Sequence, residues 1–237
     1  KAMKADGQRY DKPWLEPTGA NYLSLNGTWK LRWSEGPKPV LLGKDDFWGD
    51  GVSTEGSVWN DINVPSCLEM NGYGEPMYVN VDYPFEDRQP YVRMRDNLKN
   101  SVGSYRRDFT LPEGWENKRV FLHFDGIYSA AYVYVNGNEV GYTEGANNVS
   151  EFDITKYVRT GKNNVAVQVI RWTDGSYLEG QDMWHMSGIH RDVYLVATPK
   201  TYLADHYIKA TVTPGSTTAA TGSAATSVDL TVCNRDK

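Results

Sequence analysis

The segment from Arg171 to Leu195, RWTDGSYLEGQDMWHMSGIHRDVYL, carries groups that could bind or cleave a sugar. Hydrolysis of a glycosidic bond needs two carboxyl groups about 5–10 Å apart on opposite sides of that bond. The segment offers four carboxylates: Asp174, Glu179, Asp182 and Asp192. Their spacing alone does not favour a catalytic pair, because loop carboxylates are more often solvated or engaged as caps.

Sugar binding is a second interpretation of the same residues. A carboxylate can accept hydrogen bonds from two sugar hydroxyls at fixed geometry, and a tryptophan ring offers a flat apolar face to the C–H side of a pyranose. The 8 Trp, 16 Tyr and 6 Phe of the chain fit this interpretation, although the core of a β-sandwich uses the same residues. The residues alone therefore leave three interpretations open: an active site, a sugar-binding site and a polar turn.

The elements that must position this segment are strands, because apolar residues recur with period two and helical periodicity is missing. Alternation predicts strands at 28–33, 104–111, 120–124, 131–135 and 165–169. The dipeptide Asn136-Gly137 predicts a type I′ hairpin, since that turn needs positive φ at both positions. Short strands separated by Gly, Asn, Asp and Pro predict an antiparallel sandwich or barrel.

Two short helical turns are also predicted. SCLEMNG at 66–72 begins with Ser66 and DITKYV at 153–158 begins with Asp153, and both residue types are good helix caps. Beyond residue 200 the composition changes, and a Ser/Thr/Ala/Gly-rich stretch at 213–227 separates strand candidates at 207–213 and 228–233. Two strands alone are marginal in water, so we expect this tail to be the opening hairpin of a truncated second domain.

Composition narrows the class of protein. The chain has 237 residues and a net charge of −5, which argues against nucleic acid or an anionic membrane as a partner. Cys67 and Cys233 are interpreted as free, small apolar groups, with a single disulfide as the alternative. The four histidines lack the neighbours of a zinc motif, and NGYGEPM lacks the strand-to-helix setting of a phosphate loop.

Six segments in succession carry a family resemblance. They are LSLNGTWKLRW (23–33), VPSCLEMNGYGEPMYVNVDYPF (64–85), VGSYRRDFTLP (102–112), FDGIYSAAYVYVNGNEVGYTEG (124–145), EFDIT (151–155) and the segment at 171–195. This succession resembles the N-terminal sugar-binding domain of glycoside hydrolase family 2 β-galactosidases. The resemblance implies an all-β, galactose-binding-domain-like jelly-roll sandwich at 21–200. An N-terminal extension at 1–20 would precede it, and the start of a truncated immunoglobulin-like sandwich domain at 201–237 would follow.

The same resemblance implies a function. The parent protein would hydrolyse terminal β-galactosides with two glutamates of a later barrel domain that lies outside this chain, so that no catalytic residue is expected here. Asn80 and Asp182 would bind the galactose unit of the β-galactoside substrate. Asp182 would also be a ligand of a bound sodium ion, whereas magnesium is expected only in the barrel. The parent is expected to be a homo-oligomer that binds neither nucleic acid nor membrane, and its bacterial compartment, cytoplasmic or periplasmic and secreted, is left open.

Other residues of the segment have structural expectations. Trp184 and Glu179 are expected to build the loop, and Asp174 and Tyr177 to serve as turn and packing residues. Two positions depart from the family pattern: Gly180 stands where Asp is usual, and His185 where Arg is usual. The alternatives kept open are a free-standing carbohydrate-binding module, a fragment of a β-glucuronidase or β-mannosidase, and hydrolysis by the chain's own carboxylates.

Overall fold

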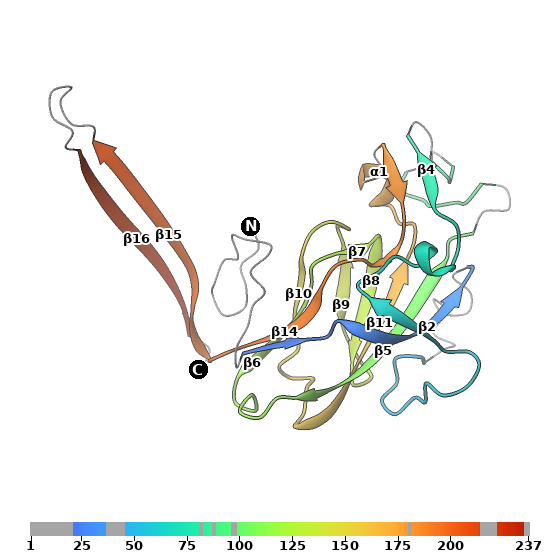
Figure 1. Ribbon diagram of the computed structural model, residues 1–237, viewed down its shortest axis with the longest axis horizontal. Coiled ribbons are helices and arrows are strands. Elements are labelled where there is room, and N and C mark those ends of the chain that lie inside the picture. The colour runs from blue at the N-terminus through green and yellow to red at the C-terminus, as the bar shows by residue number, and fades with distance from the viewer. Residues whose placement is uncertain are drawn as a thin grey trace.

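Two antiparallel sheets face each other and form a β-sandwich (Figure 1). The computed structural model describes residues 21–36, 46–80, 83–86, 89–95, 99–179, 182–213 and 222–234. Within these residues the smaller sheet has the order β1 (Tyr22–Ser24), β14 (Val193–Thr198), β6 (Arg119–Phe124) and β10 (Ser150–Asp153). The larger sheet has the order β3 (Asn60–Val64), β2 (Gly27–Ser34), β5 (Val102–Leu111), β11 (Gly161–Ile170), β8 (Ala130–Val135) and β9 (Asn138–Glu144). The predicted all-β sandwich is confirmed.

The core lies between the two sheets and follows the predicted alternation. Trp29 and Leu31 of β2 are fully buried and Trp33 packs against the same cluster, as their shared face requires. Val167 of β11 meets this core, whereas its neighbour Ala166 points to the outer face of the sheet. There Phe47, Trp59 and Tyr134 form a second cluster that alternation did not predict, because the segment carrying Phe47 and Trp59 is irregular.

The turns were predicted with mixed success. Asn136 and Gly137 both have positive φ, 49° and 81°, and join β8 to β9 as expected. The turn at 66–72 is a 3₁₀ helix, Glu69–Asn71, but Ser66 does not cap it. Its hydroxyl donates to the carbonyl oxygen of Asn63 instead, at 2.5 Å.

The stretch at 153–158 makes a single turn, in which the carbonyl oxygen of Ile154 accepts from the amides of Tyr157 and Val158 at 2.9 and 3.1 Å, in agreement with the predicted short helical turn. Asp153 caps it, since its carboxylate accepts from the amide of Thr155 at 3.1 Å. Both cysteines are free. No helix among the described residues is long and apolar enough to cross a membrane.

A long two-stranded hairpin, β15 (Thr201–Thr213) with β16 (Ser223–Asn234), projects from the sandwich (Figure 1). Ile208 pairs with Val228, and Leu230 and Val232 continue the same face of β16 at every second residue. These side chains are all more than half exposed. The hairpin is therefore amphipathic, and whether it begins an immunoglobulin-like domain stays a prediction. The expected N-terminal extension at 1–20 lies outside the described residues.

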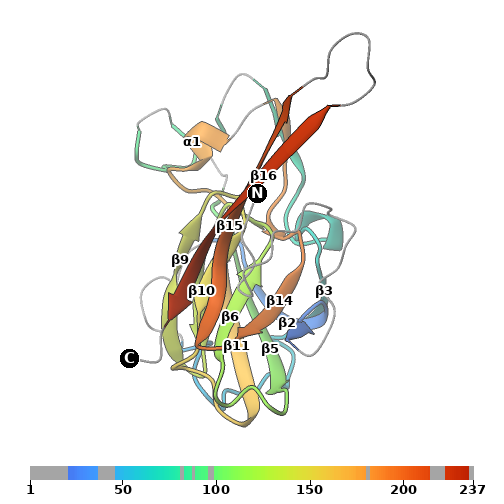
Figure 2. The same cartoon turned by 90° about the vertical axis from the view of Figure 1, so that its left-hand side faces the viewer.

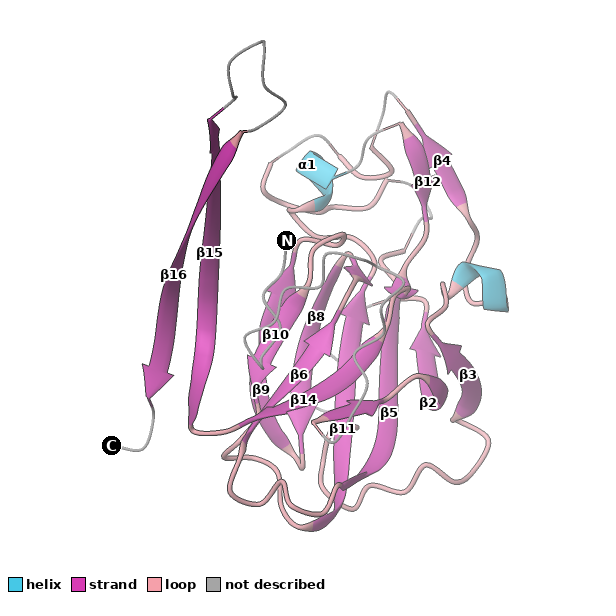
Figure 3. Cartoon of the chain, turned by 60° about the vertical axis from the view of Figure 1, so that its left-hand side comes forward, coloured by secondary structure: helices cyan, strands magenta, loops and turns pink. Residues whose placement is uncertain are grey.

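Two smaller ribbons and a short helix complete the described part of the chain. The helix lies at one end of the sandwich (Figures 2 and 3), and one of the ribbons lies at the same end (Figure 3). The ribbons are β4 (Met77–Val79) with β12 (Met183–His185), and β7 (Ile127–Tyr128) with β13 (Gly188–Ile189). The helix is α1 (Ser176–Glu179). The residues proposed from the sequence for sugar binding lie at this end.

Candidate functional site

The β4–β12 ribbon brings together two segments that are distant in the chain. In its antiparallel register Met183 pairs with Val79, Trp184 with Tyr78 and His185 with Met77. Asn80 directly follows β4 and Asp182 directly precedes β12, so that continuing the register by one step places them opposite each other. Both residues are exposed. The structure thus juxtaposes the two predicted galactose ligands, and their binding role stays a prediction.

One face of the ribbon combines polar and aromatic side chains. Residues two apart on a strand share a face, and so do directly paired residues. Asn80 and Asp182 therefore share a face with Tyr78 and Trp184, which we call the polar-aromatic face. The Tyr78 and Trp184 side chains are 50% and 56% exposed, and their ring centroids lie 5.6 Å apart. We expected Trp184 to build the loop, but its ring lies on this exposed face.

A hydrogen bond orients the carboxylate of this face. The Tyr78 hydroxyl donates to Oδ1 of Asp182, and this bond raises the pKa of Tyr78. Among the described residues Oδ1 alone of the two carboxylate oxygens has a hydrogen-bond donor, so Oδ2 can accept from a sugar hydroxyl or approach a cation. Tyr78 was missed in the sequence, because a strand of three residues is too short for its alternation to stand out.

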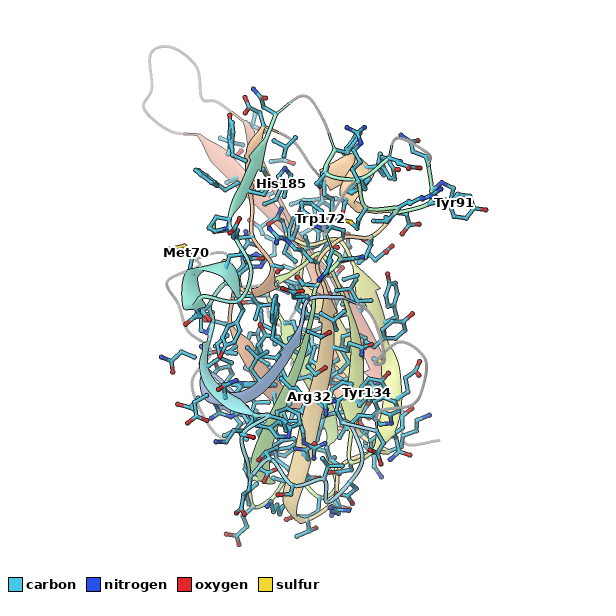
Figure 4. All side chains as sticks on the ribbon, turned by 90° about the vertical axis from the view of Figure 1, so that its right-hand side faces the viewer. Arg32, Met70, Tyr91, Tyr134, Trp172 and His185 are labelled. Carbon is cyan, nitrogen blue, oxygen red and sulfur yellow. The ribbon has the colours of Figure 1, made fainter. Side chains whose placement is uncertain are left out.

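The opposite face of the ribbon is packed onto the sandwich. Met77 contacts a buried aromatic cluster of Phe85, Trp172 and Tyr177. The Tyr177 hydroxyl donates to the carbonyl oxygen of Glu86 at 2.7 Å, in agreement with the packing role expected for Tyr177. His185 is 3% exposed, and its ring lies 5.4 Å from the ring of Trp172 (Figure 4).

Arg171, at the end of β11, anchors both strands of the ribbon. Its Nη2 donates to the carbonyl oxygen of Glu75, just before β4, at 2.7 Å and to that of His185 at 3.3 Å. Burial lowers the pKa of Arg171, and the carboxylate of Glu69, 3.4 Å from Nε, compensates its charge. Glu69 itself accepts from the amide and hydroxyl of Ser187, at 2.7 and 2.6 Å. Neither Arg171 nor Glu69 was singled out in the sequence, because buried charge pairs carry no local pattern.

Of the other three carboxylates in the segment, two accept hydrogen bonds within the domain and one is exposed in a turn. Asp192 accepts from the side-chain amide of Asn26 at 2.9 Å. Glu179 accepts from the amide of Ala146 at 3.0 Å, as a loop-building residue would, and burial raises the pKa of Glu179. Asp174 is exposed in the turn that leads into α1, where its carbonyl oxygen accepts from the amide of Tyr177 at 3.1 Å.

Asp182 alone of the four lies on the polar-aromatic face. The departure at Gly180 falls outside the described residues.

The donor set suits a metal ion only in part. Hard cations prefer oxygen ligands, and the exposed carboxylate of Asp182 is such a ligand. The described residues contain no group of three or more His, Cys, Asp or Glu side chains that could hold a metal. Asp182 thus offers one oxygen ligand of the kind that sodium prefers, and a sodium site there would need further ligands from sugar, water or another part of the protein.

Comparisons with known proteins agree with this architecture. The family model described as "Glycosyl hydrolases family 2, sugar binding domain" matches residues 22–199. A β-galactosidase of Priestia megaterium is 40% identical over 192 residues, which cover 81% of this chain and 18% of that protein. A β-galactosidase of Photobacterium profundum is 43% identical over 189 residues, which cover 80% of this chain and 18% of that protein.

Solved structures share the fold. A β-glucuronidase of an uncultured Clostridium species superimposes with a TM-score of 0.64 at 21% identity, over 94% of this chain and 36% of that one. A β-glycosidase from Bacteroides vulgatus gives a TM-score of 0.63 at 22% identity, over 92% of this chain and 25% of that one. The chain spans 18% of the length of the curated relatives it matches.

Proposed function

Because this chain belongs to glycosyl hydrolase family 2 through its sugar-binding domain at residues 22–199, we propose that it is the non-catalytic sugar-binding module of a β-galactosidase. The module contributes Asn80 and Asp182 to a galactose site, and a separate barrel domain completes that site with two catalytic glutamates. The supporting observation is the polar-aromatic face. There a carboxylate and an amide, which can bind hydroxyls, lie beside two exposed aromatic rings, which can bind a C–H face.

Galactosides are favoured over glucuronides as the ligand. The relatives at 40% and 43% identity are named β-galactosidases, whereas the β-glucuronidase at 21% identity shares only the fold. A glucuronide carries its own carboxylate, and the exposed charge of Asp182 would repel it. A neutral sugar meets no such repulsion, and its hydroxyls can donate to Oδ2.

The proposed sodium ion acts through Asp182. An oxygen-only cation at this carboxylate would hold a sugar hydroxyl electrostatically, and its chemistry is that of binding rather than of bond cleavage. Replacing sodium with choline at constant ionic strength should then weaken galactoside binding in wild type. The same exchange should leave galactoside binding by an Asp182→Ala variant unchanged. An equal effect of sodium on both proteins contradicts the assignment of Asp182 as a sodium ligand.

The test of the proposed function uses binding and turnover together. We expect methyl β-galactoside, but not methyl β-glucuronide, to shift the NMR signals of the Trp184 indole and the Asn80 side-chain amide saturably. Affinity should be about millimolar or weaker, because this chain supplies only part of the pocket. We also expect no release of nitrophenol from an aryl β-galactoside. Turnover that survives purification and disappears in Asp182→Ala refutes the non-catalytic assignment.

A further inference from the structure

His185, the last residue of β12, lies near Trp172 at one end of the sandwich (Figure 4). Its Nδ1 lies 3.0 Å from the hydroxyl oxygen of Tyr128, which belongs to β7. Its Nε2 lies 3.3 Å from the carbonyl oxygen of Val79, the last residue of β4. One buried imidazole therefore contacts three strands.

These partners determine where the ring proton lies. A carbonyl oxygen can only accept, so Nε2 carries the proton and donates to Val79. In the neutral ring Nδ1 then has a free electron pair, which accepts from the hydroxyl of Tyr128. A protonated ring would donate at both nitrogens, and the Tyr128 hydroxyl would then have to turn its proton away and accept from Nδ1. The neutral form makes both contacts without placing a charge in this buried position.

The two hydrogen bonds act on residues next to the polar-aromatic face. Val79 immediately precedes Asn80, and His185 follows Asp182 by three residues on the same strand. A ribbon of two three-residue strands has little stability of its own, so its register depends on such anchors. We infer that His185 is a positioning residue that holds Asn80 and Asp182 opposite each other. This role rests on the sugar-binding function proposed above.

The charged and titratable neighbours of His185 favour its neutral form. Burial lowers the pKa of His185, and the guanidinium of Arg171 adds to this effect, while the bond to Val79 opposes it. Glu69 is already paired with Arg171. Burial raises the pKa of Tyr128 to about 12, so its hydroxyl keeps the proton that it donates. Protonation of His185 in acid would place a buried positive charge near that of Arg171 and reverse the bond to Tyr128, which should loosen the ribbon.

The test compares two replacements of His185 in the 237-residue chain. Glutamine keeps an amide donor for Val79 and a carbonyl acceptor for Tyr128 but does not titrate, whereas phenylalanine keeps the ring volume and loses both bonds. Methyl β-galactoside is titrated by NMR near pH 7.5 and near pH 5.5, on either side of the usual histidine range. His190→Gln is the matched control, since His190 is also partly buried and has a lowered pKa.

We expect His185→Gln to bind within about twofold of wild type near pH 7.5 and to lack the extra loss of affinity that wild type shows in acid. His185→Phe should bind about tenfold more weakly at both pH values, because two neutral hydrogen bonds are missing. His190→Gln should retain the pH dependence of wild type. Wild-type affinity in the Phe variant, or an unchanged acid loss in the Gln variant, overturns the inference.

A second measurement separates this inference from the proposed function. Amide hydrogen exchange in β4 and β12 measures how readily the ribbon opens when no sugar is present. His185→Phe should accelerate it about tenfold relative to the β5–β11 ladder, and His185→Gln should not. If wild type shows no Asp182-dependent sugar binding, the proposed function fails. If exchange in the ribbon is unchanged in His185→Phe, the positioning role fails whether or not sugar binds.

Discussion

Replacing Asp182 with asparagine tests the carboxylate at the centre of the proposed site with little change of shape. The new amide side chain would still offer Tyr78 a carbonyl acceptor, so the ribbon should keep its geometry. What is lost is the charge, and the NH2 group that replaces Oδ2 can only donate, so each sugar hydroxyl must turn to accept from it in a neutral hydrogen bond. A hydrogen bond to a charged group contributes about 1.5–3 kcal/mol and a neutral one about 0.5–1.5 kcal/mol, so each sugar hydroxyl bound loses about 1–1.5 kcal/mol.

A carboxylate that accepts from two hydroxyls therefore loses about 2–3 kcal/mol, or roughly 30- to 140-fold at about 1.4 kcal/mol per decade. The upper end applies where the bound sugar and the barrel exclude water, since screening at an exposed carboxylate weakens the effect. Asn80→Ala should cost less, because its bonds are neutral. The loss should be seen in kcat/KM, which measures transition-state stabilisation from free enzyme and substrate.

The assay is steady-state kinetics on an aryl β-galactoside at fixed sodium concentration, in the full-length enzyme that the proposed function requires. Asp174→Asn, an exposed carboxylate in the neighbouring turn, is the matched control and should retain wild-type kcat/KM. If Asp182→Asn also retains it, Asp182 does not bind the substrate. An equal loss in both variants would point to long-range electrostatics rather than to contact.

Three further outcomes are expected of the chain itself. Arg171→Met should lower the free energy of unfolding by about 3–5 kcal/mol in urea denaturation, because the buried Glu69 carboxylate loses its partner. The melting temperature should fall as the pH drops from about 6.5 to 5, since His185 and His190 have lowered pKa values in the folded state and the unfolded chain takes up protons first. Leu230→Lys should reduce the fluorescence of a bound hydrophobic dye, because Leu230 lies on the apolar face of the β15–β16 hairpin.

Each of these has a control in the same chain. Lys162→Met breaks an exposed pair with Asp108 and should cost less than about 1 kcal/mol, so an equal loss at Arg171 contradicts the argument from burial. The variant that carries glutamine at both His185 and His190 should show a flatter dependence of melting temperature on pH. An unchanged slope would show that these two histidines do not cause the loss of stability in acid. Asp229→Lys lies on the other face of the hairpin and should leave dye binding unchanged.

The sandwich was predictable from the sequence because each of its longer strands carries the period-two signal several times. In β11 the side chains of Val165, Val167 and Val169 all face the core. Asn136-Gly137 is one of the few dipeptides that readily adopt the positive φ angles of a tight hairpin turn. Turn details were less predictable. Ser66 is a sound helix cap by residue type, yet its hydroxyl donates back to the carbonyl oxygen of Asn63. Residue type alone does not decide between these two local partners.

The candidate site was harder to predict from the sequence than the sandwich. β4 and β12 have three residues each, too few for alternation to stand out, and their pairing joins residues about a hundred positions apart. Family resemblance proposed Asn80 and Asp182 for one galactose site, and the antiparallel register places them opposite each other. Tyr78 and Trp184 follow from that register and from nothing that either segment shows alone.

The register of the β4–β12 ribbon is thus the property on which the proposed function depends. A slip of one residue would turn Asp182 toward the sandwich and His185 toward solvent, because strand side chains alternate between faces. Three-residue strands resist such a slip weakly by themselves. Arg171 donates to the carbonyl oxygens of Glu75 and His185, and the His185 imidazole donates to that of Val79. These contacts on the buried side fix the register and thereby the side chains that lie on the polar-aromatic face. Sugar specificity in this domain should accordingly respond to substitutions that no sugar touches.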